Sequence, residues 1–562
     1  MRNAAPRRDP RFLLCIASAL LALVVQSGEL GSADTMHRLQ TAHSFWTSQP
    51  AVFPNEYPEF GVHGRGGKLY DWYGIGQPLL MLPFDIVGTG IAKLPIFADY
   101  DDNDPTVRNI FVTYSVNVLL NVLTALVCFR FLLLLGLDMR QSIAGVLALL
   151  FCTTHLHYTQ NMMENNYICL LTLTGFCYQY EWLRSGSRKA LLIGSGALGL
   201  NLLTRLTTGL DLLIVAVFLL LDLWFEREVK PSNESVRTSV DARPLERSST
   251  KFFINGHFWE RCISYLKTAL PTYLAFLFLD RLYQFYRFGN WTTTYVHYFT
   301  IEHRLQDPTL PAKYPWETPF QVGFLGPLIS PEKSIFLFDP LIVLTILVSI
   351  FGWKHFSPVI KSFLIAAFFL VLGYICLYAR YTVWSGNFAW GDRYVSTAAE
   401  ISAFISVPLL LKFRTQLGKP LQIIGMFLIA ASLVIQLASL AFWLPLEIYQ
   451  GDDLGHPQWI IWLRFKNIVA FALGKMDAWG LNTDSMGYDQ WDYQHLTCWN
   501  FLPFVLRRMG AAPKWMVDMA LAIWGFAIVG LITVLAALGR TVEQKDRVRD
   551  SRAGPFSAGS LS

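Results

Sequence analysis

The chain has 562 residues, of which 53% are hydrophobic and 15% aromatic, and its mean hydropathy is +0.36. This apolar share is higher than that of an ordinary soluble globular protein, so a soluble enzyme is excluded as the simplest interpretation. The formal net charge of +5 is spread over several loops rather than gathered in one basic patch, which gives no support to nucleic-acid binding. We therefore expect an all-α integral membrane protein that contacts the lipid bilayer over much of its surface.

Twelve apolar windows are long enough, or nearly long enough, to cross a bilayer. They lie at roughly 12–27, 109–136, 142–156, 166–183, 189–204, 209–225, 264–282, 335–353, 362–379, 396–411, 421–445 and 515–538. The pattern predicts a bundle of about twelve transmembrane helices.

The first window is preceded by Arg2, Arg7, Arg8 and Arg11. By the positive-inside rule, this basic end stays in the cytoplasm. A cleaved signal peptide is the alternative, because a basic start and a short apolar core also fit that pattern. We favour a retained helix, since a short helix can span when its flanking residues snorkel. An even number of spans then places both termini in the cytoplasm.

The loops follow the same rule in alternation. Short connections expected in the cytoplasm carry the basic residues Arg184, Arg188, Lys189, Arg227, Lys230, Lys354, Lys361, Lys412, Arg414, Lys419, Arg540 and Lys545. The opposite side receives the long segments 28–106, 283–334, 380–395 and 446–514, which are rich in Trp, Tyr, Pro and Gly. We expect these to form an extracytoplasmic cap of loops and amphipathic helices on a multi-pass protein of a bacterial plasma membrane.

This topology divides the chain into five parts. They are an N-terminal transmembrane half at 1–225 that includes the first outer loop, a polar cytoplasmic linker at 226–262, a second transmembrane half at 263–445, an extracytoplasmic segment at 446–514, and a last helix with a cytoplasmic tail at 515–562.

Two carboxylates, Glu29 and Asp34, follow the first apolar window in the stretch GELGSAD. An acid at the outer edge of a membrane can take the proton of an incoming hydroxyl while a sugar's anomeric centre gains oxocarbenium character. Asp34 is our candidate base, and the alternative is that it merely caps an amphipathic helix over 35–45. Glu29 is the weaker candidate, because it is expected to be a solvated acid at a helix end.

A further acid, Glu164, lies in THLHYTQNMMENNY, between the third and fourth windows on the outer side. His155 and His157 precede it. Carboxylate and imidazole ligands can hold a divalent metal such as Mg or Mn, and that metal could bridge a phosphate. The alternative is a set of hydrogen-bonded interfacial side chains without a metal.

Lone arginines stand at the edges of two apolar runs. Arg205 in LLTRLTTGL needs a partner at membrane depth, either a lipid phosphate or a structural carboxylate. Arg393 in WSGNFAWGDRYV follows Trp390, so a sugar platform beside a phosphate clamp is one interpretation and an ordinary aromatic belt is the other.

The glycine-rich stretch GRGGKLYDWYGIGQPLL permits tight turns close to a ligand. Arg65 and Lys68 in it can meet an anion, and Tyr73 is a further candidate for substrate contact.

At these residues the chain resembles the GT-C superfamily of multi-span glycosyltransferases, which includes protein O-mannosyltransferases and the lipid A aminoarabinose transferases. The resemblance rests on Asp34, the segment KLYDWYGIGQPLLMLP, Glu164, the arginine of LLTRLTTGL, the segment LISPEKSIFLFDPL, and WGDRYVS, in this order from about residue 28 to 411. It implies a GT-C-like bundle that uses a polyprenyl-phosphate sugar as its donor.

The resemblance also implies roles for residues. Asp34 would be the catalytic base, and Arg205, Arg393 and Lys333 of SPEK would contact the phosphate. Members of the superfamily commonly carry two adjacent acids in the first outer loop, whereas Glu29 and Asp34 are five positions apart, so the partner of Asp34 is open.

The expected activity is inverting transfer of a hexose or pentose to a hydroxyl acceptor on a glycan, lipid or protein at the outer face. The segment after 446 resembles no family motif and is a candidate for choosing the acceptor. Two other classes stay open: a transporter or flippase of a lipid-linked sugar, and a non-catalytic protein of envelope assembly. A transporter would show repeated halves and broken helices at the midplane, and the sequence shows neither clearly.

Overall fold

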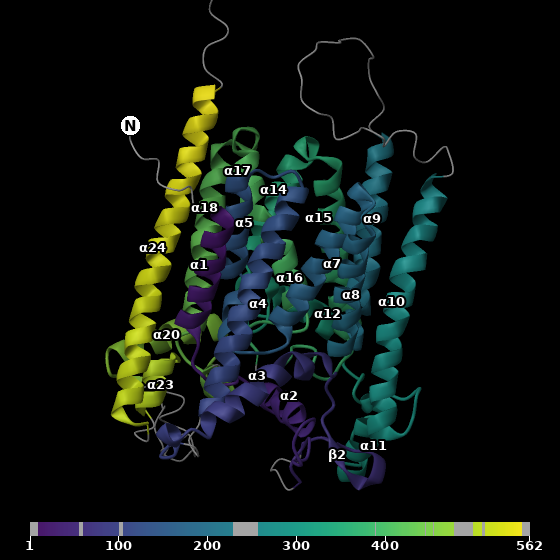
Figure 1. Ribbon diagram of the computed structural model, residues 1–562, viewed down its shortest axis with the longest axis vertical. Coiled ribbons are helices and arrows are strands. Elements are labelled where there is room, and N and C mark those ends of the chain that lie inside the picture. The colour runs from purple at the N-terminus through teal and green to yellow at the C-terminus, as the bar shows by residue number, and fades with distance from the viewer. Residues whose placement is uncertain are drawn as a thin grey trace, which may run out of the picture. The chain divides into compact units, whose positions relative to one another are not determined.

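The computed structural model describes residues 9–54, 60–100, 105–228, 257–387, 389–443, 445–452, 454–476, 498–508 and 512–552. Most of the linker predicted at 226–262 and the middle of the segment 446–514 lie outside these residues. The described chain is helical apart from one antiparallel pair of two-residue strands, β1 (Val62–His63) and β2 (Leu69–Tyr70). The all-α class is confirmed (Figure 1).

Each of the twelve predicted windows is largely helical, although several are interrupted. The window 142–156 is broken at Thr153–Thr154, and the helix in 421–445 ends at Ser439. The window 335–353 is divided between α13 (Ile335–Phe338) and α14 (Leu341–Gly352), because Pro340 has no N–H to continue the first helix. The window 396–411 is divided between α16 (Ser396–Ala403) and α17 (Ser406–Lys412).

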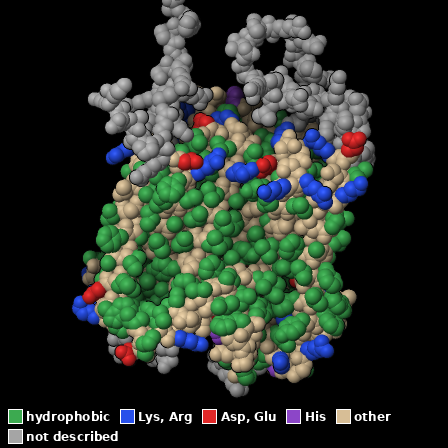
Figure 2. Space-filling view, in the orientation of Figure 1, with side chains coloured by type: hydrophobic (Ala, Val, Ile, Leu, Met, Phe, Trp, Pro, Cys, Tyr) green, Lys and Arg blue, Asp and Glu red, His purple; other side chains and the backbone are tan. Residues whose placement is uncertain are grey.

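Six of the described helical segments are long and apolar enough to cross a membrane, and four shorter helices are also apolar. The six are Val107–Leu134, Leu206–Phe225, Glu260–Phe288, Pro358–Tyr378, Arg414–Ser439 and Lys514–Thr541. On the face shown in Figure 2, hydrophobic side chains cover the middle of the helices, and charged side chains gather towards their ends. This is the surface of an integral membrane protein, because bilayer hydrocarbon accepts only the apolar middle.

The described chain forms two compact units, each drawn from separate stretches of sequence. The division into sequential parts at 1–225, 226–262, 263–445, 446–514 and 515–562 stays a prediction. The first unit contains 1–36, 83–166 and 429–562, and the second contains 37–82 and 167–428. Helices α2 (Ala33–Ser44), α3 (Gly76–Ala92), α7 (Asn165–Ser185) and α18 (Arg414–Ser439) contribute residues to both units.

In the first unit, the N-terminal helix packs between two longer helices. Its helices are α1 (Pro10–Val25), α4 (Val107–Leu134), α5 (Met139–Cys152), α6 (His155–Gln160), α19 (Pro445–Asp452), α20 (Ile460–Ala472), α23 (Leu502–Arg508) and α24 (Lys514–Arg552), with a short turn of 3-10 helix at Pro95–Phe97. Helix α1 contacts both α4 and α24, so the first apolar window is part of the packed bundle.

In the second unit, two pairs of helices make the main contacts, α8 with α10 and α9 with α15. The helices of this unit are α8 (Arg188–Thr204), α9 (Gly209–Glu228), α10 (His257–Phe288), α11 (Tyr295–Gln306), α12 (Phe320–Ile329), α13, α14, α15 (Pro358–Tyr378), α16 and α17, with 3-10 turns at Arg65–Gly67, Leu206–Thr208 and Trp353–His355. The β1–β2 hairpin packs on α11.

Candidate active site

Asp34 lies in the first turn of α2, and it is half-buried. Ser32 caps this helix, because its hydroxyl accepts a hydrogen bond from the Thr35 N–H at 3.2 Å. The interpretation of Asp34 as the cap residue is therefore wrong. The N-terminus of a helix stabilises a carboxylate electrostatically, so the position suits an ionised acid.

The segment that carries Asp34 is fixed against the loop before α7. The Thr35 hydroxyl donates to the carbonyl of Met162 at 2.6 Å. Gly31 has a φ of +78°, and a Cβ there would lie 2.6 Å from Cα of Asn161, so only glycine fits. Glu164 lies on this second loop and is buried. The structure thus brings together the segments of two acids that are 130 positions apart in the sequence.

Glu29 has a different environment from the one expected. It is 6% exposed and forms an ion pair with Arg508, so the prediction of a solvated helix-end acid is wrong. Burial raises the pKa of Glu29, and the Arg508 cation opposes this effect. Local sequence offers no signal for this pair, because its partners are 479 positions apart.

The two histidines proposed as metal ligands have separate protein partners. Nε2 of His155 lies 2.8 Å from Oδ1 of Asn121, and Asn161 donates from Nδ2 to Nε2 of His157 at 3.1 Å. Burial and the neighbouring Arg464 cation lower the pKa of His157 to about 3. A fixed cation beside the ring also disfavours a divalent ion.

Among the described residues, no set of clustered ligand atoms combines His155, His157 and Glu164. A metal at this site stays a prediction.

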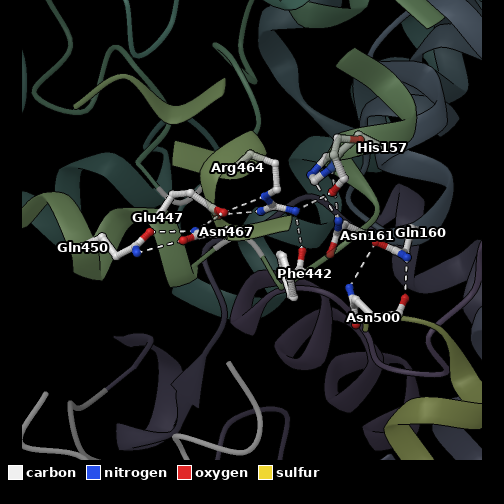
Figure 3. A network of polar contacts seen from close by, with 10 residues as sticks. His157, Gln160, Asn161, Phe442, Glu447, Gln450, Arg464, Asn467 and Asn500 are labelled. Carbon is white, nitrogen blue, oxygen red and sulfur yellow. Dashed lines mark hydrogen bonds and ion pairs between the residues drawn. The ribbon is translucent and has the colours of Figure 1, made fainter. Parts of the chain in front are cut away.

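The buried side chains of Gln160 and Asn500 join several segments of the first unit, as Figure 3 shows. Gln160 donates to the carbonyl of Val25 at 2.9 Å and to that of Leu440 at 3.2 Å, and it accepts from Asn500 at 3.0 Å. The backbone N–H of Leu502 donates to the carbonyl of Gln26 at 2.9 Å. The end of α1 is therefore held by segments from the far end of the chain.

A buried ion pair lies in the same network (Figure 3). Arg464 donates to both carboxylate oxygens of Glu447, at 2.7 and 2.6 Å, and to the carbonyls of Ser439 and Phe442. Asn467 also donates a hydrogen bond to the Glu447 carboxylate, at 2.9 Å. The described part of the segment 446–514 thus includes a packed hairpin of α19 and α20.

In the second unit, two arginines that the sequence singled out lie beside one tyrosine. The guanidinium carbon of Arg205 is 5.0 Å from the ring centroid of Tyr394, and that of Arg393 is 5.2 Å from it. The ring of Tyr378 stacks on that of Tyr394, with 4.3 Å between the two centroids. Because two cations repel each other, such a site is favourable for an anion between or beside them.

The end of helix α8 places Arg205. Arg205 ends α8 with extended backbone, immediately before the helix that contains the span Leu206–Phe225, so it lies at a membrane edge. Tyr295, at the start of α11, belongs to the same cluster. Burial and the neighbouring Tyr394 and Tyr378 raise the pKa of Tyr295 to about 12, so its phenol remains a hydrogen-bond donor at neutral pH.

Arg393 ends a loop whose backbone is sharply turned. Gly386 has a φ of +77°, and a Cβ there would lie 2.4 Å from Cγ of Arg393. Lys333 is 1% exposed, and its ammonium donates to the carbonyls of Asn387 and Ala389. It contacts the loop of Arg393 through backbone oxygens.

Trp390 is fully buried and packs edge to face on Phe338, with 5.0 Å between ring centroids. This burial gives no support to the sugar platform, which stays a prediction. Its indole anchors the loop before Arg393 to α13.

The glycine-rich stretch is placed on the β1–β2 hairpin of the second unit. Arg65 and Lys68 are exposed in the turn between the strands, where Gly66 and Gly67 have positive φ. The guanidinium of Arg38 covers the ring of Tyr73 at 3.8 Å.

Sequence reasoning missed Asp71, which is buried beside Tyr73. Its carboxylate accepts from Thr41 at 2.7 Å and from Arg287 at 3.2 Å, and burial raises the pKa of Asp71 against the effect of Arg287. An acid between aromatic residues in KLYDWYG was the only available signal, and its arginine partner is 216 positions away.

Comparison with solved structures finds a match to the crystal structure of ArnT from Cupriavidus metallidurans bound to undecaprenyl phosphate. The match covers 92% of this chain and 77% of that chain, at 11% sequence identity and a TM-score of 0.38. No protein-family model matches the chain, and no curated protein matches it. A similarity at this TM-score carries no argument about function, so the proposal below depends on the site itself.

Proposed function

We propose that this protein is a membrane glycosyltransferase of the GT-C type, which transfers a sugar from a polyprenyl-phosphate donor to a hydroxyl acceptor. The observation that carries the proposal is the pair Arg205 and Arg393, both close to the ring of Tyr394 and next to a candidate membrane-spanning helix. A phosphate on a lipid chain would reach this depth and would accept hydrogen bonds from both guanidinium groups. The tyrosine hydroxyls add neutral donors for its oxygens.

The proposed reaction proceeds with inversion. The acceptor hydroxyl attacks the anomeric carbon, its proton passes to a carboxylate oxygen of Asp34, and the bond from the anomeric carbon to the phosphate oxygen breaks. The negative charge that develops on the leaving phosphate is stabilised by Arg205 and Arg393. Glu164 would orient the sugar or an arginine.

We also propose that both termini lie in the cytoplasm and that the site faces the opposite side. The distribution of basic residues between alternate loops supports this orientation. The acceptor, a glycan, lipid or protein hydroxyl, would then be a component of the cell envelope.

The first experiment measures release of free polyprenyl phosphate by purified protein, with a panel of polyprenyl-phosphate sugars and an envelope extract as acceptor. Release that requires both the donor and the extract supports a transferase. Binding of a donor with its movement across vesicle membranes but without release would show a transporter instead. Neither binding nor release would leave an assembly protein as the surviving class and would refute the proposal.

Removing either arginine is expected to weaken binding of undecaprenyl phosphate. Hydrogen bonds to charged groups contribute about 1.5–3 kcal/mol, so Arg205→Met and Arg393→Met should each raise the Kd roughly 10- to 100-fold. Arg188→Met is the matched control, because Arg188 is an exposed arginine at the far end of α8. Equal affinities of all three variants for the lipid would contradict the phosphate site.

Gly386→Ala should disturb the same site without removing a charge. The new Cβ would overlap the Arg393 side chain, and a positive φ is unfavourable for alanine, so we expect the Kd for undecaprenyl phosphate to rise about tenfold. Gly66→Ala is the control, since Gly66 also has a positive φ but its Cβ would have no neighbour within 4 Å. The two variants can be compared by lipid binding in detergent, and similar values for both would exclude the steric explanation.

A further inference from the structure

Lys333 is a buried cation that the proposed mechanism does not use. It lies in the turn between α12 and α13, where its backbone N–H donates to the carbonyl of Ser330 at 3.2 Å. Its Nζ is 2.6 Å from the carbonyl oxygen of Asn387 and 3.0 Å from that of Ala389. Two of the three ammonium hydrogens are therefore directed to the backbone of one loop.

That loop has an unfavourable backbone conformation. Gly386 and Gly391 have positive φ, and Asn387 between them also has a φ of +48°. For a residue other than glycine, a positive φ costs free energy. The conformation of Asn387 therefore persists only where the surrounding structure holds it. Lys333 supplies such support at Asn387 itself.

The loop leads directly to the proposed phosphate site. Gly386 packs against the aliphatic part of Arg393, and Asp392 accepts from the N–H groups of Tyr394 and Val395 at 2.9 and 3.3 Å. The path of the loop thus decides where the guanidinium of Arg393 and the ring of Tyr394 lie.

We propose that Lys333 is a positioning residue, whose hydrogen bonds to the carbonyls of Asn387 and Ala389 hold the loop that places Arg393. This inference rests on the proposed function, because it assigns Lys333 a role in lipid-phosphate binding that acts through Arg393. It differs from the role implied by the resemblance, in which Lys333 contacts the phosphate itself.

The pH dependence of the affinity for undecaprenyl phosphate distinguishes these two roles. The charged groups that face the ammonium are Glu332, at 3.7 Å, Asp392 and Arg393. Burial lowers the pKa of Lys333 to about 8, and burial raises that of Asp392 to about 7. Between pH 7.5 and 9.5, Lys333 is therefore expected to lose its proton while Asp392 remains ionised.

Loss of that proton has opposite consequences in the two roles. A neutral amine keeps two hydrogens for the two carbonyls. A lysine whose pKa is lower in the closed loop than in water also favours the closed loop as the pH rises through this range. A lysine that bound the phosphate directly would instead lose its charge and its affinity.

The first test is local and does not depend on lipid binding. Hydrogen exchange of the amides in 389–395 should be about tenfold faster in Lys333→Met than in the unaltered protein. Lys354→Met is the matched control, because Lys354 is an exposed lysine of the same unit. Unchanged exchange in Lys333→Met would overturn the proposal.

The second test measures the Kd for undecaprenyl phosphate. Lys333→Met should weaken binding about tenfold, and the effects of Lys333→Met and Arg393→Met should not add in the double variant. The affinity of the unaltered protein should not fall between pH 7.5 and 9.5. Additive effects, or an affinity that falls through pH 8 and is independent of pH in Lys333→Met, would show a direct ligand and overturn the inference.

The two proposals fail differently. If undecaprenyl phosphate does not bind, or if Arg393→Met binds it normally, the proposed function fails while the exchange result can still stand. If the lipid binds through Arg393 and Lys333→Met changes neither exchange nor affinity, only the positioning role fails.

Discussion

Replacing Asp34 by asparagine is expected to lower sugar transfer by about 10²- to 10⁴-fold, which is the usual contribution of a general base. The amide cannot accept the proton of the acceptor hydroxyl, yet it has nearly the same shape as the carboxylate. Affinity for the polyprenyl-phosphate sugar should change little, because the phosphate is assigned to Arg205 and Arg393. Single-turnover release of polyprenyl phosphate, measured beside donor binding, separates these quantities.

Asp99→Asn is the matched control for this experiment, since Asp99 is an exposed acid in the same predicted outer segment. It should transfer sugar at the normal rate. Normal transfer by Asp34→Asn would remove Asp34 from the mechanism. Loss of donor binding together with transfer would instead show that Asp34 contacts the donor.

The second large effect is expected on stability. Arg464→Met leaves the carboxylate of Glu447 buried without its cation, and breaking a buried pair in this way costs about 3–5 kcal/mol. The carbonyls of Ser439 and Phe442 also lose their donor. Unfolding of the purified protein in detergent, followed by circular dichroism, should therefore begin at a clearly lower temperature.

The double variant Arg464→Met with Glu447→Gln tests the reason. Because it removes both charges, it should recover part of the stability lost in Arg464→Met alone. Lys466→Met on the same helix is the control, since Lys466 is only half-buried and should have a small effect. If Arg464→Met were as stable as Lys466→Met, the pair would not stabilise the hairpin of α19 and α20.

Local sequence predicted the helices well. Every apolar window is largely helical, because spanning segments must satisfy their own backbone hydrogen bonds and the required length is fixed by the bilayer. Arg205 and Arg393 could also be singled out from the sequence, because a cation at the end of an apolar run is costly unless it has a partner. The position of Asp34 just after the first span was likewise available from the sequence.

The amino-acid sequence by itself determined the helical class, the membrane environment and the residues worth testing. Only the tertiary structure decided their surroundings. It buried Trp390, paired Glu29 with Arg508, directed Lys333 to two carbonyls and set Arg205 and Arg393 beside one ring. The physical reason is that spans and edges follow from local hydropathy, whereas burial and pairing depend on contacts between residues that are tens to hundreds of positions apart.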